Sequence, residues 1–139
     1  MVKTLPVSPL APKKSAKPKA LSGMRMSALA SGARYQGRDD VLLIELDGAA
    51  RIAGVFTSSK MPSAAVDLSR DHLTATRGRA RAILVNAGNA NAFTGAAGAK
   101  AAAATAQAAA QKIGCPLERV LVASTGVIGE VLETAPMLK

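Results

Sequence analysis

Aromatic residues are almost absent from this chain of 139 residues, which has no Trp, one Tyr (Tyr35) and two Phe (Phe56 and Phe93). About half of the residues are nevertheless apolar, so a core has to be built from Ala, Val, Leu and Ile. These small side chains bury less area per residue than aromatic ones. The length suits one domain with a modest core, and a second independent domain is not expected.

The chain also has a single cysteine, Cys115, and a single histidine, His72. One cysteine excludes an internal disulfide, and no CxxC or His/Cys cluster offers a metal site, so we expect a cytoplasmic protein without a bound metal. No apolar run reaches the roughly 18 residues of a membrane helix, and prolines and lysines occupy the region where a secretion signal is apolar. We therefore expect neither a membrane span nor secretion.

Acidic residues are missing before Asp39, whereas eight of the 18 basic residues lie there. From Asp39 onward ten basic residues face nine acidic ones, so the net charge of +9 belongs mainly to the N-terminal part. Residues 1–24 are rich in Pro, Lys, Ala and Ser, which predicts a disordered basic leader. A mitochondrial transit peptide is the weaker alternative, because no arginine occurs before Arg25. Residues 25–139 form the predicted folded part.

The patterning of the folded part predicts an α/β protein. Residues 41–46 are almost continuously apolar, and residues 47–50 supply turn chemistry before a second strand-like run at 51–57, which together predict a β-hairpin. Only Glu45 interrupts the first run, so we expect layers on both faces of the sheet.

A strand, a helix and a further strand are predicted in the second half. Residues 82–85 and 120–123 are apolar enough for buried strands, and the Ala-rich segment 96–113 predicts a helix that ends at Gly114, with Pro116 just beyond. The expected fold class is a layered sandwich of a mixed sheet and helices, incomplete in this chain.

Arg77, Arg79 and Arg81 alternate with small residues and would share one face of an extended backbone. A solvated strand end is the preferred interpretation, and an anion site is the alternative.

Residues 86–95, NAGNANAFTG, form a loop of Asn and Gly between a predicted strand and a predicted helix. Asn and Gly tolerate left-handed backbone angles, so several unusual dihedrals are expected there. The segment is either a ligand-binding loop or a plain connection with local Asx turns. It contains neither a phosphate-binding loop ending in GK[ST] nor GxGxxG, so a nucleotide fold is not supported.

The tripeptide Ser124-Thr125-Gly126 follows the last predicted strand. The Thr125 hydroxyl and the Gly126 amide could stabilise an oxyanion in acyl transfer, although ordinary turn chemistry explains the same residues. His72 is interpreted as a surface residue and Cys115 as a packed structural thiol. A Cys115/His72 nucleophile pair is the weaker alternative.

Taken together, several stretches resemble the bifunctional ornithine acetyltransferase and N-acetylglutamate synthase family of arginine biosynthesis. The resemblance covers about residues 26–139 and corresponds to the beginning of the α chain of that family. The stretches that carry it are residues 28–34, 37–40, 53–60, 79–95 and 124–130.

The resemblance implies an amino-acid acetyltransferase that moves acetyl from N-acetylornithine, or from acetyl-CoA as a co-substrate, to glutamate through an acyl-threonine, without a resident cofactor. By position, Thr125 and Gly126 would form its oxyanion hole. Family precursors cut themselves before the nucleophilic threonine, and their α and β chains stay associated as a hetero-oligomer.

The resemblance places that threonine beyond residue 139. Thr134 lacks the surroundings of the family's cut site and is expected to be a cap or turn residue. Catalysis by this chain alone is therefore not expected, and the β chain or downstream part is the expected partner. Two other hypotheses remain. The first is a non-enzymatic protein that binds nucleic acid or an acidic partner through the basic leader, although the leader has no aromatic residue to stack on bases. The second is a non-functional truncated reading frame.

Overall fold

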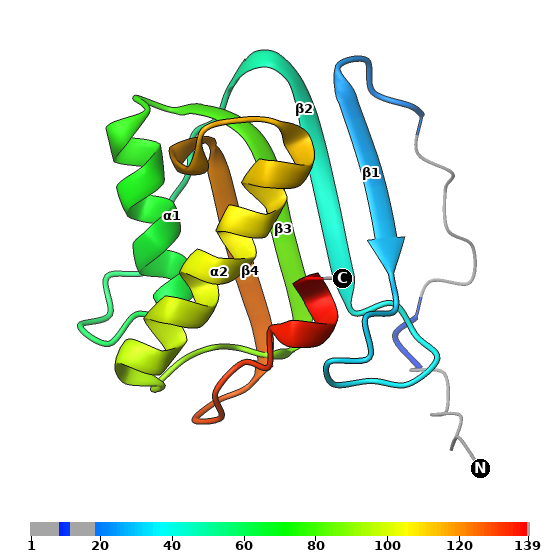
Figure 1. The fold of residues 1–139 in the computed structure, drawn as a ribbon, viewed down its shortest axis with the longest axis vertical. Helices are drawn as coiled ribbons and strands as arrows, with labels where there is room; N and C mark the ends of the chain where they lie inside the picture. The colour runs from blue at the N-terminus through cyan, green and yellow to red at the C-terminus, as the bar shows by residue number, and fades with distance from the viewer. Residues whose placement is uncertain (1–8, 12–18, 139) are drawn as a thin grey trace.

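The computed structural model describes residues 9–11 and 19–138, so most of the predicted leader lies outside the described residues. The described chain folds into one sheet with two long helices (Figure 1). The elements in chain order are β1 (Met24–Leu29), β2 (Val41–Arg51), α1 (Ala64–Ala75), β3 (Arg79–Asn89), α2 (Gly95–Ile113), the 3-10 turn η1 (Leu117–Arg119), β4 (Val120–Val127) and the 3-10 turn η2 (Ala135–Leu138).

The four strands lie in the order β1-β2-β3-β4. The first three pair antiparallel, whereas β3 and β4 are parallel and are joined through α2. The mixed α/β sheet confirms the predicted fold class. Because β3 and β4 are parallel, the loops that follow them meet at the same edge of the sheet.

The predicted hairpin is wrong. Residues 41–51 form one strand, β2, and residues 52–57 lie in a loop. The expected turn residues instead form an irregularity between Glu45 and Ala50, where Gly48 has a φ of +56°. On both sides of this irregularity β2 keeps pairing with β3, so the turn residues interrupt the register of one strand and do not connect two strands.

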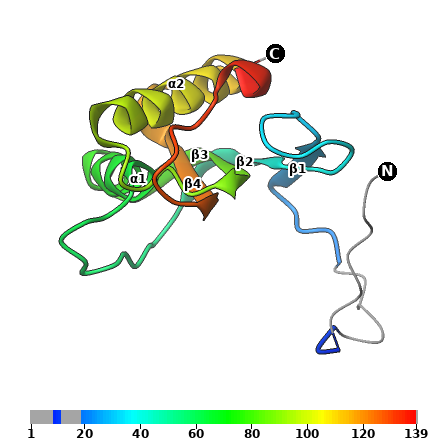
Figure 2. The same cartoon turned by 90° about the horizontal axis from the view of Figure 1, so that it is seen from below.

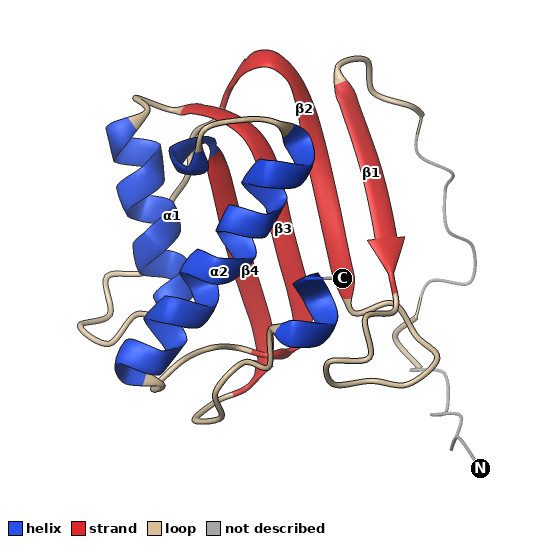
Figure 3. Ribbon diagram, in the orientation of Figure 1, coloured by secondary structure: helices blue, strands red, loops and turns tan. Residues whose placement is uncertain are grey.

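The helices do not form the predicted two outer layers. In Figures 1 and 2, α2 lies over one face of the sheet and α1 lies beside β4, and in the described residues no helix covers the other face. Figure 3 shows the same arrangement by secondary structure, with η2 on the α2 side. Within the described chain the sandwich is thus one-sided.

The core is built from small aliphatic residues, as the composition predicts. Alanines from α1, α2 and β3 meet Val120 and Val122 of β4 in one cluster. Four of these alanines are at most 2% exposed: Ala65, Ala82, Ala106 and Ala110. Such short side chains let α2 lie close to the sheet.

The predicted helix 96–113 is confirmed as α2, one residue longer at its start. It ends as predicted at Gly114, which adopts the left-handed conformation (φ 71°, ψ 47°) and donates its amide to the Ala110 carbonyl. The predicted strand 82–85 is the central part of β3, and the predicted strand 120–123 is the first half of β4; both strands are longer than expected.

Helix α1 and strand β1 were not predicted. A signal for α1 is present, because the Ser63 hydroxyl accepts from the Val66 amide and Asp67 lies in the first turn, both typical of a helix start. A signal for β1 is present as well, because its sequence MRMSAL alternates apolar and polar residues from Met24 to Ala28, although five of its six positions are exposed.

Candidate functional site

Thr125 and Gly126 lie near the C-terminal end of β4 and are both exposed. Val120 and Val122 of the same strand pack into the core. Because side chains alternate along a strand, Thr125 points to the opposite face of the sheet. Thr125 is therefore exposed on the face that no described helix covers.

Gly126 lies directly opposite Gly88 of β3. A Cβ on Gly126, whose φ is +134°, would meet the Gly88 backbone. The pairing of β3 with β4 becomes irregular at Gly88 and Asn89. Two glycines thus bring the two backbones into close contact where the regular ladder ends.

Three buried asparagines organise the loop that follows β3. Asn86 accepts from the Ser124 hydroxyl (2.6 Å) and donates to the Asn89 carbonyl (2.9 Å). The Asn89 side chain accepts from the Asn91 amide (2.7 Å) and donates to the Glu130 carbonyl (3.1 Å). These side chains tie the end of β3 to the segment after β4, so the loop beside Thr125 is held by side-chain amides.

The predicted unusual dihedrals of this loop are confirmed. Asn91 and Phe93 have φ values of +48° and +58°, and Gly88 and Gly95 also have positive φ. Asn91 is fully buried, and its side chain donates to the Gly98 carbonyl and accepts from the Thr94 hydroxyl. Hydrogen bonding of this kind offsets the strain of a left-handed asparagine.

Asp40 connects the segment before β2 to the end of β3. It is 4% exposed, its carboxylate accepts from the Ser31 amide (2.6 Å), and its carbonyl accepts from the Ala87 amide (2.8 Å). Burial by itself raises the pKa of Asp40, but the Ser31 amide and hydroxyl and the amides of Arg34 and Tyr35 together lower it below its ordinary value. The buried carboxylate is thus held in its charged form.

The segment after Ser31 lies against Gly88. A Cβ on Gly88 would come within 2.6 Å of Arg34 Cγ and 2.9 Å of the Tyr35 ring. The Arg34 guanidinium also pairs with Glu130 Oε2 at 2.7 Å. Residues far apart in the sequence therefore surround the Gly88–Gly126 contact.

The prediction that His72 is a surface residue is wrong. His72 lies on α1, is 7% exposed, and its Nδ1 is 2.7 Å from the Val120 carbonyl oxygen. A carbonyl only accepts, so Nδ1 carries the proton. Ser69, one turn earlier, donates to the Val122 carbonyl (2.7 Å) and accepts from the Val122 amide (2.9 Å). Both side chains bind the outer edge of β4.

Cys115 is partly buried and packs against the core cluster, in agreement with the predicted structural thiol. The pKa of the Cys115 thiol is raised, chiefly by burial, which outweighs the opposing charges of Arg81 and Arg119. A raised pKa leaves less thiolate at neutral pH, which is the opposite of activation.

Thr134 immediately precedes η2, and its carbonyl accepts from the Met137 amide at 2.8 Å. This confirms its predicted place in a turn. Among residues 9–11 and 19–138, no three His, Cys, Asp or Glu side chains are grouped closely enough to hold a metal ion. No described helix is long and apolar enough to cross a membrane.

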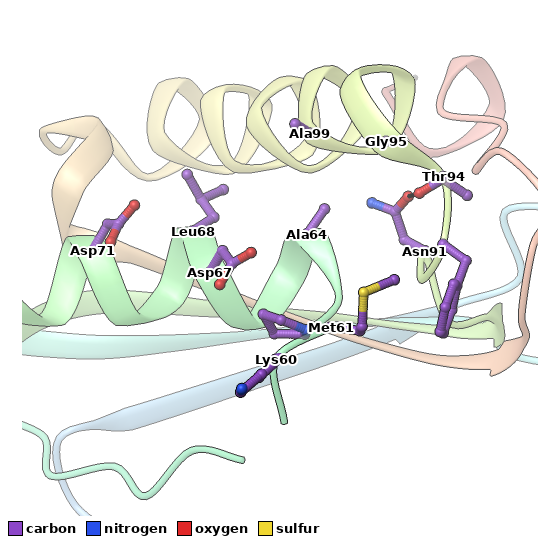
Figure 4. A pocket seen from close by; sticks show the side chains of 12 residues that line it. Lys60, Met61, Ala64, Asp67, Leu68, Asp71, Asn91, Thr94, Gly95 and Ala99 are labelled. Carbon is purple, nitrogen blue, oxygen red and sulfur yellow. Dashed lines mark hydrogen bonds between the residues drawn. The ribbon is translucent and has the colours of Figure 1, made fainter. Parts of the chain in front are cut away.

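A hollow of about 450 Å³ lies between α1 and the start of α2 (Figure 4). Asp67 and Asp71 line it on the α1 side, and Asn91 and Thr94 line it beside α2. Neither Thr125 nor Gly126 borders it. The hollow is therefore separate from the exposed strand end that carries these two residues.

The fold and this strand end define an open α/β sheet in which the exposed residues Thr125 and Gly126 lie beside a loop held by asparagines. Residues 25–139 match the model of the ArgJ family, and the chain belongs to that family. The chain is similar to the arginine biosynthesis bifunctional protein ArgJ of Rhizobium meliloti, with 54% identity over 91% of this chain and 30% of the relative. The chain is 50% identical to the ArgJ protein of Gluconobacter oxydans over 95% of this chain and 30% of the relative. The chain thus spans less than a third of the length of these curated relatives.

Two solved structures are similar to this fold, each with a TM-score of 0.79 and each matching 84% of this chain. One is the bifunctional protein from Bacillus halodurans, which is 31% identical and is covered over 60% of its chain. The other is the ornithine acetyltransferase from Mycobacterium tuberculosis in complex with ornithine, which is 36% identical and is covered over 63% of its chain.

Proposed function

We propose that this chain supplies the oxyanion-stabilising part of an acetyltransferase that moves acetyl from N-acetylornithine to glutamate. The observation that carries the proposal is the exposure of Thr125 and Gly126 at the end of β4, in a chain of the ArgJ family. The Thr125 hydroxyl and the Gly126 amide are the two donors. Both donors are neutral, so unlike a cationic side chain they are not drawn into an ion pair with a carboxylate, and they are available to the negative charge as it develops.

Exposure on the helix-free face supports this role. An oxyanion donor must reach an acyl group held by other residues, so a donor inside the core would be useless. Rigidity supports it as well, because donors stabilise a transition state best when they need not reorganise. The Gly88–Gly126 contact and the Asn86–Ser124 hydrogen bond hold the backbone on either side of Thr125.

The nucleophile and most substrate contacts belong, in this proposal, to a downstream part corresponding to the rest of the relatives' length. That part would be the β chain or a continuation of the same precursor, and it would form a hetero-oligomer with this chain after autocatalytic cleavage. The complete assembly would work in the cytoplasm, with N-acetylornithine and glutamate as substrates and acetyl-CoA as an additional donor.

The test is a chimera in which residues 1–139 are joined to the downstream part of the Rhizobium meliloti relative. Acetyl transfer from N-acetylornithine to glutamate is measured for the chimera and for Thr125→Val, which keeps the side-chain shape but lacks the hydroxyl. We expect Thr125→Val to lower kcat by about 100-fold to 1000-fold with a small change in KM, and Thr125→Ser to retain most of the activity.

Thr74→Ala is the matched control, because Thr74 is an exposed threonine on α1 whose hydroxyl donates to the Arg70 carbonyl of the same helix. It should leave kcat unchanged. A folded, cleaved chimera without acetyl transfer would refute the proposed activity, and full activity of Thr125→Val would refute the role of Thr125.

A further inference from the structure

A second hollow, of about 530 Å³, lies at the other end of the strands from Thr125. β3 begins at Arg79 and β4 at Val120, whereas Thr125 and Gly126 lie near the end of β4. Six residues line the hollow, and none of them is acidic. They are Arg51, Ala75, Thr76, Arg77, Arg79 and Arg119.

The four arginines of this hollow differ from the other arginines of the chain. Of the nine arginines, four pair with carboxylates and a fifth, Arg38, lies 4.1 Å from the centre of the Tyr35 ring. The remaining four have no carboxylate or ring partner in the described part of the chain, and all of them line this one hollow. The four that pair with carboxylates are Arg25, Arg34, Arg70 and Arg81.

The strand register brings two of these like charges together. Arg51 and Arg79 lie directly opposite each other on β2 and β3, an arrangement that is destabilising for like charges. Arg77 has a φ of +52°, which a side chain other than Asn, Asp or Gly rarely adopts. The C-terminal end of α1 favours one cation beside it, but it does not account for four.

We propose that this hollow binds a small anion that carries two or more linked phosphate groups. Guanidinium groups bind phosphate oxygens through paired hydrogen bonds, and a bound anion relieves the repulsion between Arg51 and Arg79. Four positive charges without an acid match a multiply charged anion better than a single carboxylate. The volume is within the range of small-molecule sites. This site is independent of the proposed acetyl transfer.

The sequence favoured a solvated strand end for Arg77, Arg79 and Arg81. The structure separates these three residues, because Arg81 lies 3.7 Å from Glu45 whereas Arg77 and Arg79 line the hollow. Arg51 and Arg119 come from other elements, and sequence spacing could not connect them with Arg77 and Arg79.

The test is calorimetric titration of the 139-residue chain with inorganic tripolyphosphate at low salt. We expect saturable binding with one site per chain. The double variant Arg51→Gln/Arg79→Gln should weaken binding by about 100-fold, on the basis of about tenfold for each lost charged contact. The matched control is Arg25→Gln/Arg70→Gln, which removes the same net charge from arginines outside the hollow and should change affinity by less than about threefold.

Thermal unfolding of the two double variants separates loss of the site from loss of the fold. Removal of the Arg51–Arg79 repulsion should leave the melting temperature of Arg51→Gln/Arg79→Gln unchanged or higher. Equal weakening in both double variants would overturn the proposal, because it would show that net charge alone decides binding. Unchanged affinity in Arg51→Gln/Arg79→Gln would show that these two arginines do not bind the anion, and it would overturn the proposal as well. Absence of saturable binding, or binding of duplex DNA but not of tripolyphosphate, would also refute it.

Discussion

Gly126 and Gly88 lie opposite each other on the parallel strands β4 and β3, so close that a Cβ on Gly126 would collide with the Gly88 backbone. This contact lies beside Thr125, and it restricts what the sequence can place there. Each glycine also has a positive φ, +134° at Gly126 and +107° at Gly88.

Substitution of Gly126 should therefore be severe. Gly126→Ala introduces both a backbone clash and an unfavourable φ, and we expect it to lower the free energy of unfolding by about 3 kcal/mol or more. Gly129→Ala is the control, because Gly129 has a φ of +85° but nothing lies within 4 Å of its Cβ position. It should lose only about 1 kcal/mol from its backbone angle. Urea denaturation of both variants measures the difference, and equal losses would contradict the clash.

The Ser69 hydroxyl should be important for stability because it serves two backbone groups of β4. Ser69→Ala leaves the buried amide and carbonyl of Val122 without their partner, and the expected loss is about 2–4 kcal/mol. Thr74→Ala, on the same helix but exposed, should lose less than about 0.5 kcal/mol. Denaturant titration monitored by circular dichroism compares the two, and a small effect of Ser69→Ala would argue against this contact.

His72 should tolerate only substitutions that keep a donor toward the Val120 carbonyl. His72→Leu fills the buried position with an apolar side chain but removes the Nδ1 donor, and we expect a loss of about 1–3 kcal/mol. Asp71→Asn, at the exposed neighbouring position, is the control and should change stability little. Equilibrium unfolding at neutral pH provides the measurement, and a neutral His72→Leu would show that the hydrogen bond is dispensable.

Asp40 should make stability depend on pH in the acidic range. Its pKa is lower in the folded chain than the ordinary value of about 3.9. The stabilisation from the charged carboxylate is therefore complete above that ordinary value and is lost as the pH falls through the lower folded-state value. Unfolding free energies of the wild type and Asp40→Asn, measured between neutral and strongly acidic pH, should differ most at neutral pH and converge in acid. A constant difference across this range would contradict the shifted pKa.

Cys115 should react slowly with thiol reagents. Burial raises its pKa, so the thiolate fraction near neutral pH is smaller than for a free cysteine. Alkylation by iodoacetamide should be slower in the folded chain than in the chain unfolded by urea, where Cys115 regains its ordinary pKa and full access. Equal rates in the two states would refute this expectation.

The elements with strong local signals could be predicted from the sequence. The alanine content of 96–113 and the glycine after it predict α2 and its end, and the apolar runs at 82–85 and 120–123 predict β3 and β4. The turn residues around Gly48 led to the wrong prediction of a hairpin, because the same residue types occur in strand irregularities and in chain reversals. Only the pairing with β3 decides between the two. β1 was missed although its sequence MRMSAL alternates apolar and polar residues, because this short run directly follows the segment predicted as a disordered leader.

Thr125 and Gly126 were named as oxyanion donors from the tripeptide together with the family resemblance, and this role stays a prediction. The residues that surround them in the fold could not be named from the sequence. Asp40 accepts from the amide of Ala87, more than forty residues further along the chain, and local patterns do not report such distant contacts. His72 was misplaced because its neighbour Asp71 made the segment look polar, whereas one face of α1 is buried against β4.

The two outer strands of the sheet differ in a way that limits how other chains can join it. At β4, Ser69 and His72 occupy backbone groups of the outer edge, so α1 blocks the addition of a further strand there. At β1, no described strand lies beyond the outer edge. Within the described part of the chain, only the β1 edge is therefore open to pairing with another polypeptide, on the side of the sheet away from the strand that carries Thr125.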